Sequence, residues 1–240
     1  VKSKVLMTLS SSEPRAGTVA AQVTAAIAAI ELPRGMWPDL VSQLLAAIGD
    51  LHNPCQRQAA LQAIGFTCEV VDPAVLAAQS NEILTAVIQG ARKEETSPEV
   101  QLAALRALLN SLEFVRLNFE REGERNFIMQ VVCEATQSPH VAVKVAAFEN
   151  LVRIMQLYYD KMRFYMEQAL FGLTVLGMRD PEPHVALQAV EFWSTVCDEE
   201  IELSLEAAEA LEFNEEPAHV SYHFAQIALP EIAPVLMELL

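Results

Sequence analysis

The sequence predicts an all-α protein, a right-handed α-solenoid of tandem two-helix repeats, and three observations support this fold class. Similar segments begin at Pro54, Pro98, Pro139 and Pro183, which are 44, 41 and 44 residues apart. Pairs of small residues recur from positions 59, 103, 146 and 189, at steps of 44, 43 and 43. Strand signals are nearly absent, because no alternating run is bounded by Asn-Gly or Asp-Gly turns. This repeat period is typical of two-helix solenoids.

Each recurring segment is expected to be the second helix of a repeat. Proline suits a first helical turn, where its missing N–H loses no hydrogen bond. The small pair lets a neighbouring helix approach closely, and apolar residues at helical spacing form the buried stripe. First helices are expected over 36–49, 74–91, 120–136 and 160–178, with an initial pair over 1–10 and 16–31 and a last helix over 219–240. We therefore expect one HEAT-like solenoid over 1–240, with about five and a half repeats, cut from a longer protein.

Composition and charge exclude several classes of protein and of binding partner. The chain has 240 residues, 52% of them hydrophobic, and 8 glycines, which indicates an ordered protein. Its 32 acidic and 16 basic residues give a net charge of −16, so we expect no nucleic acid partner and no binding to an anionic membrane. No 18 consecutive residues are apolar, so no membrane-spanning segment is expected. The four cysteines form no C-x-x-C pair, which favours reduced thiols.

The sequence lacks the common catalytic motifs. It holds no G-x-x-x-x-G-K-[ST], G-x-G-x-x-G, G-x-S-x-G or H-E-x-x-H, and a chain this poor in glycine has few of the loops that cradle phosphates. His219 and His223 are four residues apart and would share one face of a helix, but no third metal ligand accompanies them. We expect a protein that is not an enzyme and that needs no metal or cofactor.

Five distinctive strings point to a family. They are SNEILTAVIQGARKEE at 80–95, ALLNSLEF at 107–114, ERNFIMQVVCEATQSP at 124–139, NLVRIMQLYYDKM at 150–162 and VEFWSTVCDEE at 190–200. Together they closely resemble the importin-β (karyopherin-β) family of nuclear import receptors, which are built of HEAT repeats. The resemblance implies a carrier that moves between cytoplasm and nucleus and that acts in the nuclear envelope at nuclear pores. A generic HEAT-repeat scaffold, such as a phosphatase regulatory subunit, is the alternative, since period and charge alone do not separate the two.

The family resemblance also implies shallow apolar pockets between the first helices of adjacent repeats, which accept phenylalanine side chains of FG-repeat nucleoporins. The positions that match this pocket are Leu84, Thr85, Ile88, Glu124, Phe127 and Ile128. Thr85 and Glu124 are the weaker candidates, because each is also compatible with a solvated surface. A second groove is implied at Tyr165 and Leu173.

The residues of the first pocket also follow a pattern of their own. Ile83, Leu84, Val87 and Ile88 form an apolar arc wider than one buried stripe requires, so we expect part of it to stay exposed. Ordinary core packing is the alternative, because apolar residues at helical spacing are usually core. The substitution Ile88→Asp is expected to abolish peptide binding and to leave the fold intact, whereas unfolding would identify Ile88 as core.

The last quarter of the chain is strongly acidic. Residues 180–240 hold 14 acidic residues and no Lys or Arg, which favours a basic partner. The family resemblance implies contacts with Ran-GTP at Glu191, Asp198 and Glu199, and it implies that the importin-α adaptor or basic cargo binds mostly outside this chain. The alternative is a solvated acidic face. We expect such a face at Glu206, Glu209 and Glu212, because they repeat every three residues.

Overall fold

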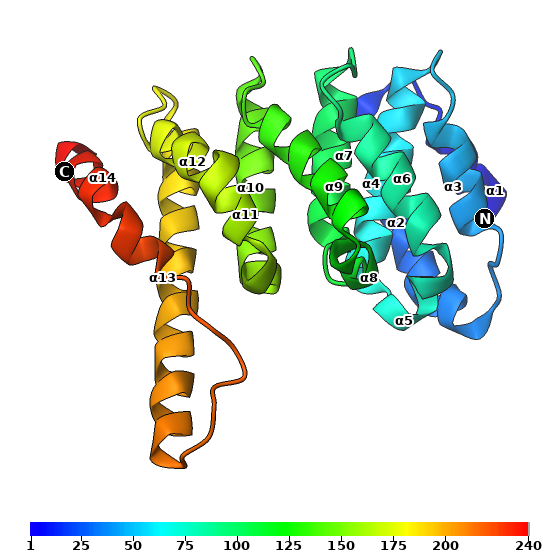
Figure 1. Ribbon diagram of the computed structural model, residues 1–240. Coiled ribbons are helices and arrows are strands. Elements are labelled where there is room, and N and C mark those ends of the chain that lie inside the picture. Colours follow the sequence, from blue (N-terminus) through cyan, green and yellow to red (C-terminus); the bar gives the residue numbers. More distant parts are fainter. Residues whose placement is uncertain (240) are drawn as a thin grey trace. The chain divides into compact units, whose positions relative to one another are not determined.

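Figure 1 shows the protein as a computed structural model, which describes residues 1–239. All regular elements in that range are helices or helical turns, which confirms the all-α prediction. The chain forms two compact units, Val1–Ala146 and Ala147–Leu240, and the boundary falls within helix α10 (Val141–Tyr158). The expected single solenoid over 1–240 stays a prediction.

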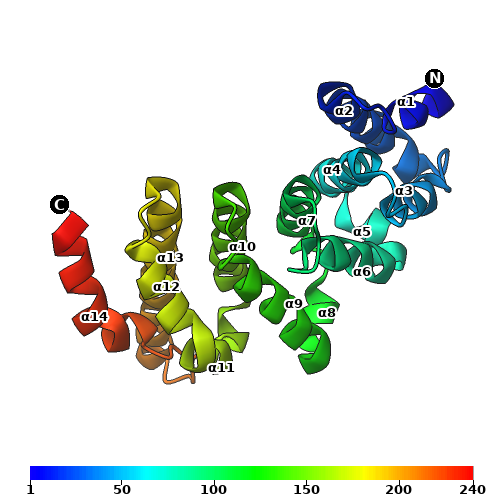
Figure 2. The ribbon, with the colours of Figure 1, turned by 90° about the horizontal axis from the view of Figure 1, so that it is seen from above.

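The first unit is built of two rows of helices. In the first row α3, α6 and α9 follow one another, and in the second row α2, α4 and α7 do (Figure 2). Hairpins join the rows, because α3 packs on α4 and α6 packs on α7. The helices of this unit are α1 Lys2–Thr8, α2 Pro14–Glu31, α3 Leu40–Ile48, α4 Pro54–Val70, α5 Pro73–Leu76, α6 Ser80–Ala91, α7 Pro98–Ser111, α8 Arg116–Glu120 and α9 Glu122–Ala135.

Three of the four repeat prolines begin a second-row helix, as predicted. Pro54, Pro98 and Pro183 are the first residues of α4, α7 and α13 (Pro183–Glu212). Pro139 is the exception, because α10 begins two residues later, at Val141. The carbonyl of His140 accepts the backbone N–H groups of Val143 and Lys144, in the first turn of that helix, so Pro139 lies in the preceding turn.

Small residues allow the close packing of the first unit. A side chain added at Gly65 would place its Cβ 3.1 Å from the Cα of Ala107, on the next second-row helix. A Cβ at Gly90 would lie 3.1 Å from the Cβ of Ala104, across the α6–α7 hairpin. Such distances are tighter than ordinary contact, so both positions favour glycine because of packing rather than backbone conformation. Ala104, which belongs to one of the small pairs that mark the repeat, therefore lies at a contact between helices, as the sequence predicts.

The second unit contains a broken first-row segment and one long helix. The expected helix over 160–178 is interrupted by a π-helical turn, in which the backbone hydrogen bonds span five residues rather than four. The elements after α10 are a 3-10 turn Tyr159–Lys161, α11 Arg163–Tyr165, the π turn Met166–Leu170, α12 Phe171–Met178, α13 Pro183–Glu212 and α14 Phe224–Leu239. In this unit α12, α13 and α14 pack on one another.

The final helix begins later than predicted. Helix α13 is 30 residues long and extends beyond α12 and α14, and a return segment (213–223) runs back from its end to α14 (Figure 1). Asn214 and His223 have φ angles of 53° and 58°, in the left-handed region, so neither belongs to a right-handed helix. Helix α14 therefore begins at Phe224 rather than at 219. The expected placement of His219 and His223 on one helical face is wrong for the same reason.

A buried carboxylate fixes the beginning of α14. Glu200 lies in the middle of α13. Its carboxylate accepts the backbone N–H groups of Phe224 and Ala225, at 2.5 and 3.1 Å. The Tyr159 hydroxyl donates to the same carboxylate at 2.7 Å and accepts the backbone N–H of Tyr222 at 2.9 Å. A carboxylate at a helix N-terminus satisfies otherwise unpaired N–H groups and interacts favourably with the helix dipole. Glu200 thus serves as the N-cap of a helix to which it does not belong.

One helical segment, Pro14–Arg34, is long and apolar enough to cross a membrane by length and composition alone. We expected no such segment, because the apolar residues are not strictly consecutive. The segment is rich in alanine and a third of its most apolar window is buried, with α2 packed against α4. A core helix passes the same test, so the segment is weak evidence for membrane insertion.

Candidate functional site

The six residues predicted for the first pocket come together in one cavity. The cavity lies between α6 and α9, the short helix α8 contributes to its wall, and its volume is about 380 Å³. Two neighbouring first-row helices therefore form the pocket, as the family resemblance implies. Its lining residues are Asn81, Leu84, Thr85, Ile88, Gln89, Arg92, Asn118, Glu124, Phe127 and Ile128.

The floor of the pocket belongs to the core of the first unit. Leu84, Ile88 and Ile128 are only 6%, 2% and 1% exposed. The expected exposure of the α6 arc is wrong, since Ile83 is also buried, and the reason is that α6 packs against α3, α7 and α9 and needs a wide apolar face. The exposed apolar surface is instead the ring of Phe127, which is 45% exposed.

Helical spacing explains how the pocket walls arise. On α6, Leu84 and Ile88 are one turn apart and form the floor. Thr85 and Gln89 form the next ridge of the same helix, which is polar and exposed. On α9, the buried Ile128 adds to the floor, and Phe127 is the exposed apolar residue of the lining. The result is an apolar base with one aromatic wall and one polar wall.

Hydrogen bonds organise the polar rim of the pocket, where α8 meets the first turns of α6 and α9. The Nδ2 group of Asn118 donates to Asn81 Oδ1 at 2.8 Å and to Glu124 Oε2 at 2.6 Å, and Arg121 donates to Glu124 Oε1 at 2.8 Å. The hydrogen bond from Arg121, and after it the one from Asn118, hold the pKa of Glu124 below its ordinary value. The Thr85 hydroxyl donates to the Asn81 carbonyl at 2.7 Å. Glu124 is therefore a fixed carboxylate rather than a freely solvated one.

Four lining residues were not predicted from the sequence. Asn81, Gln89 and Arg92 follow from the pocket residues by helical spacing, because they lie along the exposed side of α6 and just beyond its end. Asn118 has no such signal. It lies on a helix of only five residues between two longer ones, where periodicity carries no information.

This pocket is suited to binding rather than to chemistry. Its floor is aliphatic, and its only carboxylate is already held by two donors. Over residues 1–239 no group of three or more His, Cys, Asp or Glu side chains is placed to hold a metal ion. Such a pocket accepts an apolar side chain of a ligand, with polar groups at its rim to orient the neighbouring atoms.

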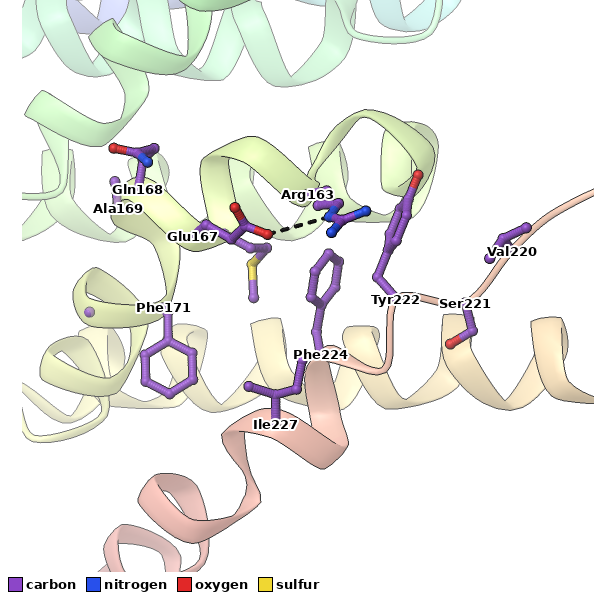
Figure 3. Close-up of a pocket in the computed structure, with 12 residues that line it drawn as sticks. Arg163, Glu167, Gln168, Ala169, Phe171, Val220, Ser221, Tyr222, Phe224 and Ile227 are labelled. Carbon is purple, nitrogen blue, oxygen red and sulfur yellow. Dashed lines mark hydrogen bonds and ion pairs between the residues drawn. The ribbon is translucent and has the colours of Figure 1, made fainter.

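A larger cavity, of about 590 Å³, lies in the second unit (Figure 3). The π turn and α12 form one side of this cavity, and the return segment and the first turns of α14 form the other. Arg163 pairs with Glu167 at 3.3 Å and lies 5.8 Å from the centre of the Tyr222 ring. The lining residues are Arg163, Met166, Glu167, Gln168, Ala169, Phe171, Gly172, Val220, Ser221, Tyr222, Phe224 and Ile227.

The second groove predicted from the sequence is a different feature. Tyr165 is buried, Leu173 is half-buried, and neither lines the cavity of Figure 3. The pairing of these two residues in an FG-binding groove stays a prediction. The cavity in Figure 3 was missed because three of its lining residues lie in the irregular return segment and four lie in the π turn, and neither segment follows the α-helical period.

The acidic residues of α13 differ in their surroundings. Glu191 and Asp198 are exposed and seven residues apart, so they share one face of the helix, and Glu199 is half-buried beside them. Burial, followed by the charges of Glu202 and Asp198, raises the pKa of Glu199. An uncompensated acidic face of this kind attracts a cationic partner.

The predicted solvated face at the end of α13 is wrong at one position. Glu206 accepts the backbone N–H of Ala218 at 3.0 Å and lies 3.1 Å from a ring nitrogen of His219. The return segment folds back along α13 and brings these groups to Glu206. Glu209 and Glu212 are exposed, as expected.

Comparisons with known proteins agree with this architecture. No family model matches the chain. Importin subunit beta-1 of Schizosaccharomyces pombe is 59% identical over 240 residues, and that of Saccharomyces cerevisiae is 48% identical over 242 residues. Both alignments cover 100% of this chain and 28% of the relative.

Solved structures give the same result. A crystal structure of importin β superposes with a TM-score of 0.92 at 51% identity and covers 99% of this chain and 27% of that one. A Kap95:Nup1 complex superposes at 0.87 and 47% identity. A structure in which Kap95p binding induces the switch loops of RanGDP to adopt the GTP-bound conformation superposes at 0.89 and 46%. Both again cover 99% of this chain and 27% of the other. The chain therefore spans little more than a quarter of these proteins, and it belongs to the importin-β family of HEAT-repeat α-solenoids.

Proposed function

We propose that this chain is part of a nuclear transport receptor and that the pocket between α6 and α9 binds FG-repeat nucleoporins. The observation that carries the proposal is the convergence of all six predicted residues around one pocket with an apolar floor and an exposed aromatic wall. The structure of a relative, Kap95, in complex with Nup1 supports a nucleoporin as the ligand. The protein acts as a carrier, without catalysis, in the cytoplasm, the nucleus and the pores of the nuclear envelope.

The mechanism follows from the size of the pocket. A phenylalanine ring buries roughly 150 Å² or more, yet ordering the peptide around it offsets much of that gain. Each contact is therefore weak and short-lived. Passage through a pore filled with FG motifs requires such contacts, since avidity then arises from repetition. The cavity in the second unit, lined by Met166, Phe171 and Phe224, offers the same apolar chemistry to a second motif.

A titration with an FxFG peptide tests the proposal. The protein is titrated by NMR or fluorescence with this peptide and with a matched peptide in which serine replaces phenylalanine. Saturable binding with a Kd of roughly 0.1–1 mM, lost with the serine peptide, is the expected result. Equal responses to both peptides would favour the generic HEAT scaffold, which has no reason to bind short FG peptides and which the relatives do not favour.

We propose Ran-GTP as the partner of the acidic face of α13. Glu191, Asp198 and Glu199 are the contact residues, because the first two share an exposed face and the third adjoins it. The structure of Kap95p with RanGDP supports this partner class. The importin-α adaptor or a basic cargo would bind mostly through regions outside this chain. Because Ran-GTP and the cargo would bind at different places, Ran-GTP would displace the cargo if the two binding events are coupled.

Charge reversal tests the Ran contact. Asp198→Lys should weaken Ran-GTP binding, and the loss should be largest at low salt because exposed charges are screened as salt rises. Glu231→Lys is the matched control, since Glu231 is an exposed acid on α14 and outside the proposed contact. Equal losses with the two variants would show a general effect of net charge and would remove Asp198 from the contact.

A further inference from the structure

We propose that Asn118 is a positioning residue of the FG pocket, which ties the two first-row helices together and orients Glu124 toward the ligand. The inference rests on the proposed binding of FG peptides between α6 and α9. No sequence pattern marked Asn118, and its role follows from three observations: its burial, its two hydrogen bonds, and the helices that those bonds connect.

Asn118 is held rigidly. The residue is only 3% exposed, although it lies on a helix of five residues and lines the pocket. Its backbone N–H donates to the carbonyl of Val115 at 2.9 Å, and the next residue, Phe119, is fully buried. The neighbouring Arg125 donates to the Phe119 carbonyl, which further anchors the helix. The backbone that carries the Asn118 side chain is thus held in place.

The two donor bonds of Asn118 end on different helices. Its Nδ2 group has two hydrogens, and it donates to Asn81 Oδ1 on α6 at 2.8 Å and to Glu124 Oε2 on α9 at 2.6 Å. Both donors are therefore used, and a single side chain bridges the two walls of the pocket. Loss of this bridge would leave the separation of α6 and α9 at this end to apolar packing alone.

The bridge also fixes the orientation of the Glu124 carboxylate. Arg121 binds Oε1 of the carboxylate at 2.8 Å while Asn118 binds Oε2, so both oxygens are oriented. Each carboxylate oxygen keeps a lone pair, which is available to a backbone N–H of the peptide that enters the pocket. Asn118 therefore supports the apolar contact at Phe127 by fixing an acceptor on the same helix, one turn before that ring.

The variant Asn118→Asp tests this role with little change of shape. It removes both donors and places an acidic oxygen against the carboxylate of Glu124, so affinity for the FxFG peptide should fall about tenfold. Asn110→Asp is the matched control. Asn110 is a half-buried residue on α7 that donates to the Gly65 carbonyl at 3.2 Å and lies 3.5 Å from Glu69, so it undergoes the same chemical change outside the pocket. The control should bind the peptide as the wild type does.

Two readouts separate positioning from simple destabilisation. The pKa of Glu124, measured by NMR of its side-chain carboxyl carbon, should rise in Asn118→Asp, because a donor is lost and a negative charge gained. In a Glu124→Gln background, the effect of Asn118→Asp on peptide affinity should become much smaller. If Asn118→Asp does not fold, Asn118→Ser removes the bridge without adding charge and should show the same coupling to Glu124.

The outcomes distinguish this inference from the function on which it rests. If wild-type protein does not bind the FxFG peptide, the proposed function fails, and the pKa of Glu124 still tests the bridge. If the wild type binds and Asn118→Asp binds equally well, the positioning role is refuted. An equal loss of affinity in the presence and absence of the Glu124 carboxylate would also refute it, because Asn118 would then act through the fold alone.

Discussion

Replacing Phe127 with alanine should weaken FG binding while the protein stays folded. The ring is 45% exposed, and a phenylalanine side chain has roughly 200 Å² of surface, so about 90 Å² is available to a ligand. At about 25 cal/mol per Å², covering that surface contributes about 2 kcal/mol, and its loss should raise Kd about 30-fold. The buried part of the ring should cost roughly 2 kcal/mol of stability, which a folded domain tolerates.

A substitution in the buried floor of the pocket should instead destabilise the fold. Ile88 is only 2% exposed, so Ile88→Asp would bury an unpaired carboxylate at a cost of several kcal/mol. That variant therefore does not separate binding from folding, contrary to the expectation from sequence. Phe127→Ala does, and Phe213→Ala is its control, because Phe213 is 74% exposed and lines neither pocket.

The assay combines two measurements on each variant. Thermal unfolding followed by circular dichroism reports stability, and an NMR titration with the FxFG peptide reports affinity. We expect a large rise in Kd for Phe127→Ala and none for Phe213→Ala. If Phe127→Ala binds the peptide within about threefold of the wild type, corresponding to less than about 0.7 kcal/mol, the ring is not a wall of the binding site.

Three further predictions concern the second unit. Tyr159→Phe removes the hydroxyl that donates to Glu200, so amide hydrogen exchange at 222–225 should accelerate about tenfold. Unchanged exchange would show that the hydroxyl does not hold the beginning of α14 in place. Glu199→Gln should raise the melting temperature at pH 7, because the raised pKa of Glu199 means that its charged form disfavours folding. The gain should vanish as the pH falls below the ordinary value of 4.5, and a gain that does not change with pH would contradict this. Gly177→Ala should cost roughly 1–3 kcal/mol in chemical denaturation, since its Cβ would lie 2.6 Å from the ring of Phe148, and wild-type stability would refute the clash.

The parts of this protein that were predictable from sequence are those that repeat. Proline at a first helical position and small residues at helix contacts reflect local rules, and three of the four repeat prolines obey them. The interruptions were not predictable. The π turn at Met166–Leu170 leaves no periodic signal in the chain. The return segment after Glu212 ends where Glu200 binds the start of α14, and such a tertiary contact leaves no periodic signal either.

In the candidate site, too, some features were predictable from the sequence and others depend on tertiary contacts. The six pocket residues came from a family resemblance, and helical spacing alone would have assigned Leu84, Ile88 and Ile128 to the core, which is where their burial places them. These residues have two roles at once. Exposure of Phe127 and the bridge at Asn118 arise from the way α8 and α9 meet α6, and no single helix encodes that arrangement.

The double role of the pocket floor limits how tightly one pocket binds. A deeper pocket would require smaller side chains at Leu84, Ile88 or Ile128, but these side chains also hold α6 and α9 together, and each truncation would cost roughly 1–5 kcal/mol of stability. A shallow pocket is therefore the arrangement that the packing of adjacent repeats allows. A solenoid gains affinity by offering further pockets along its first row, because each added contact multiplies the total without loosening any repeat. Weak single contacts thus follow from the architecture, and the proposed passage through a nuclear pore requires contacts of this kind.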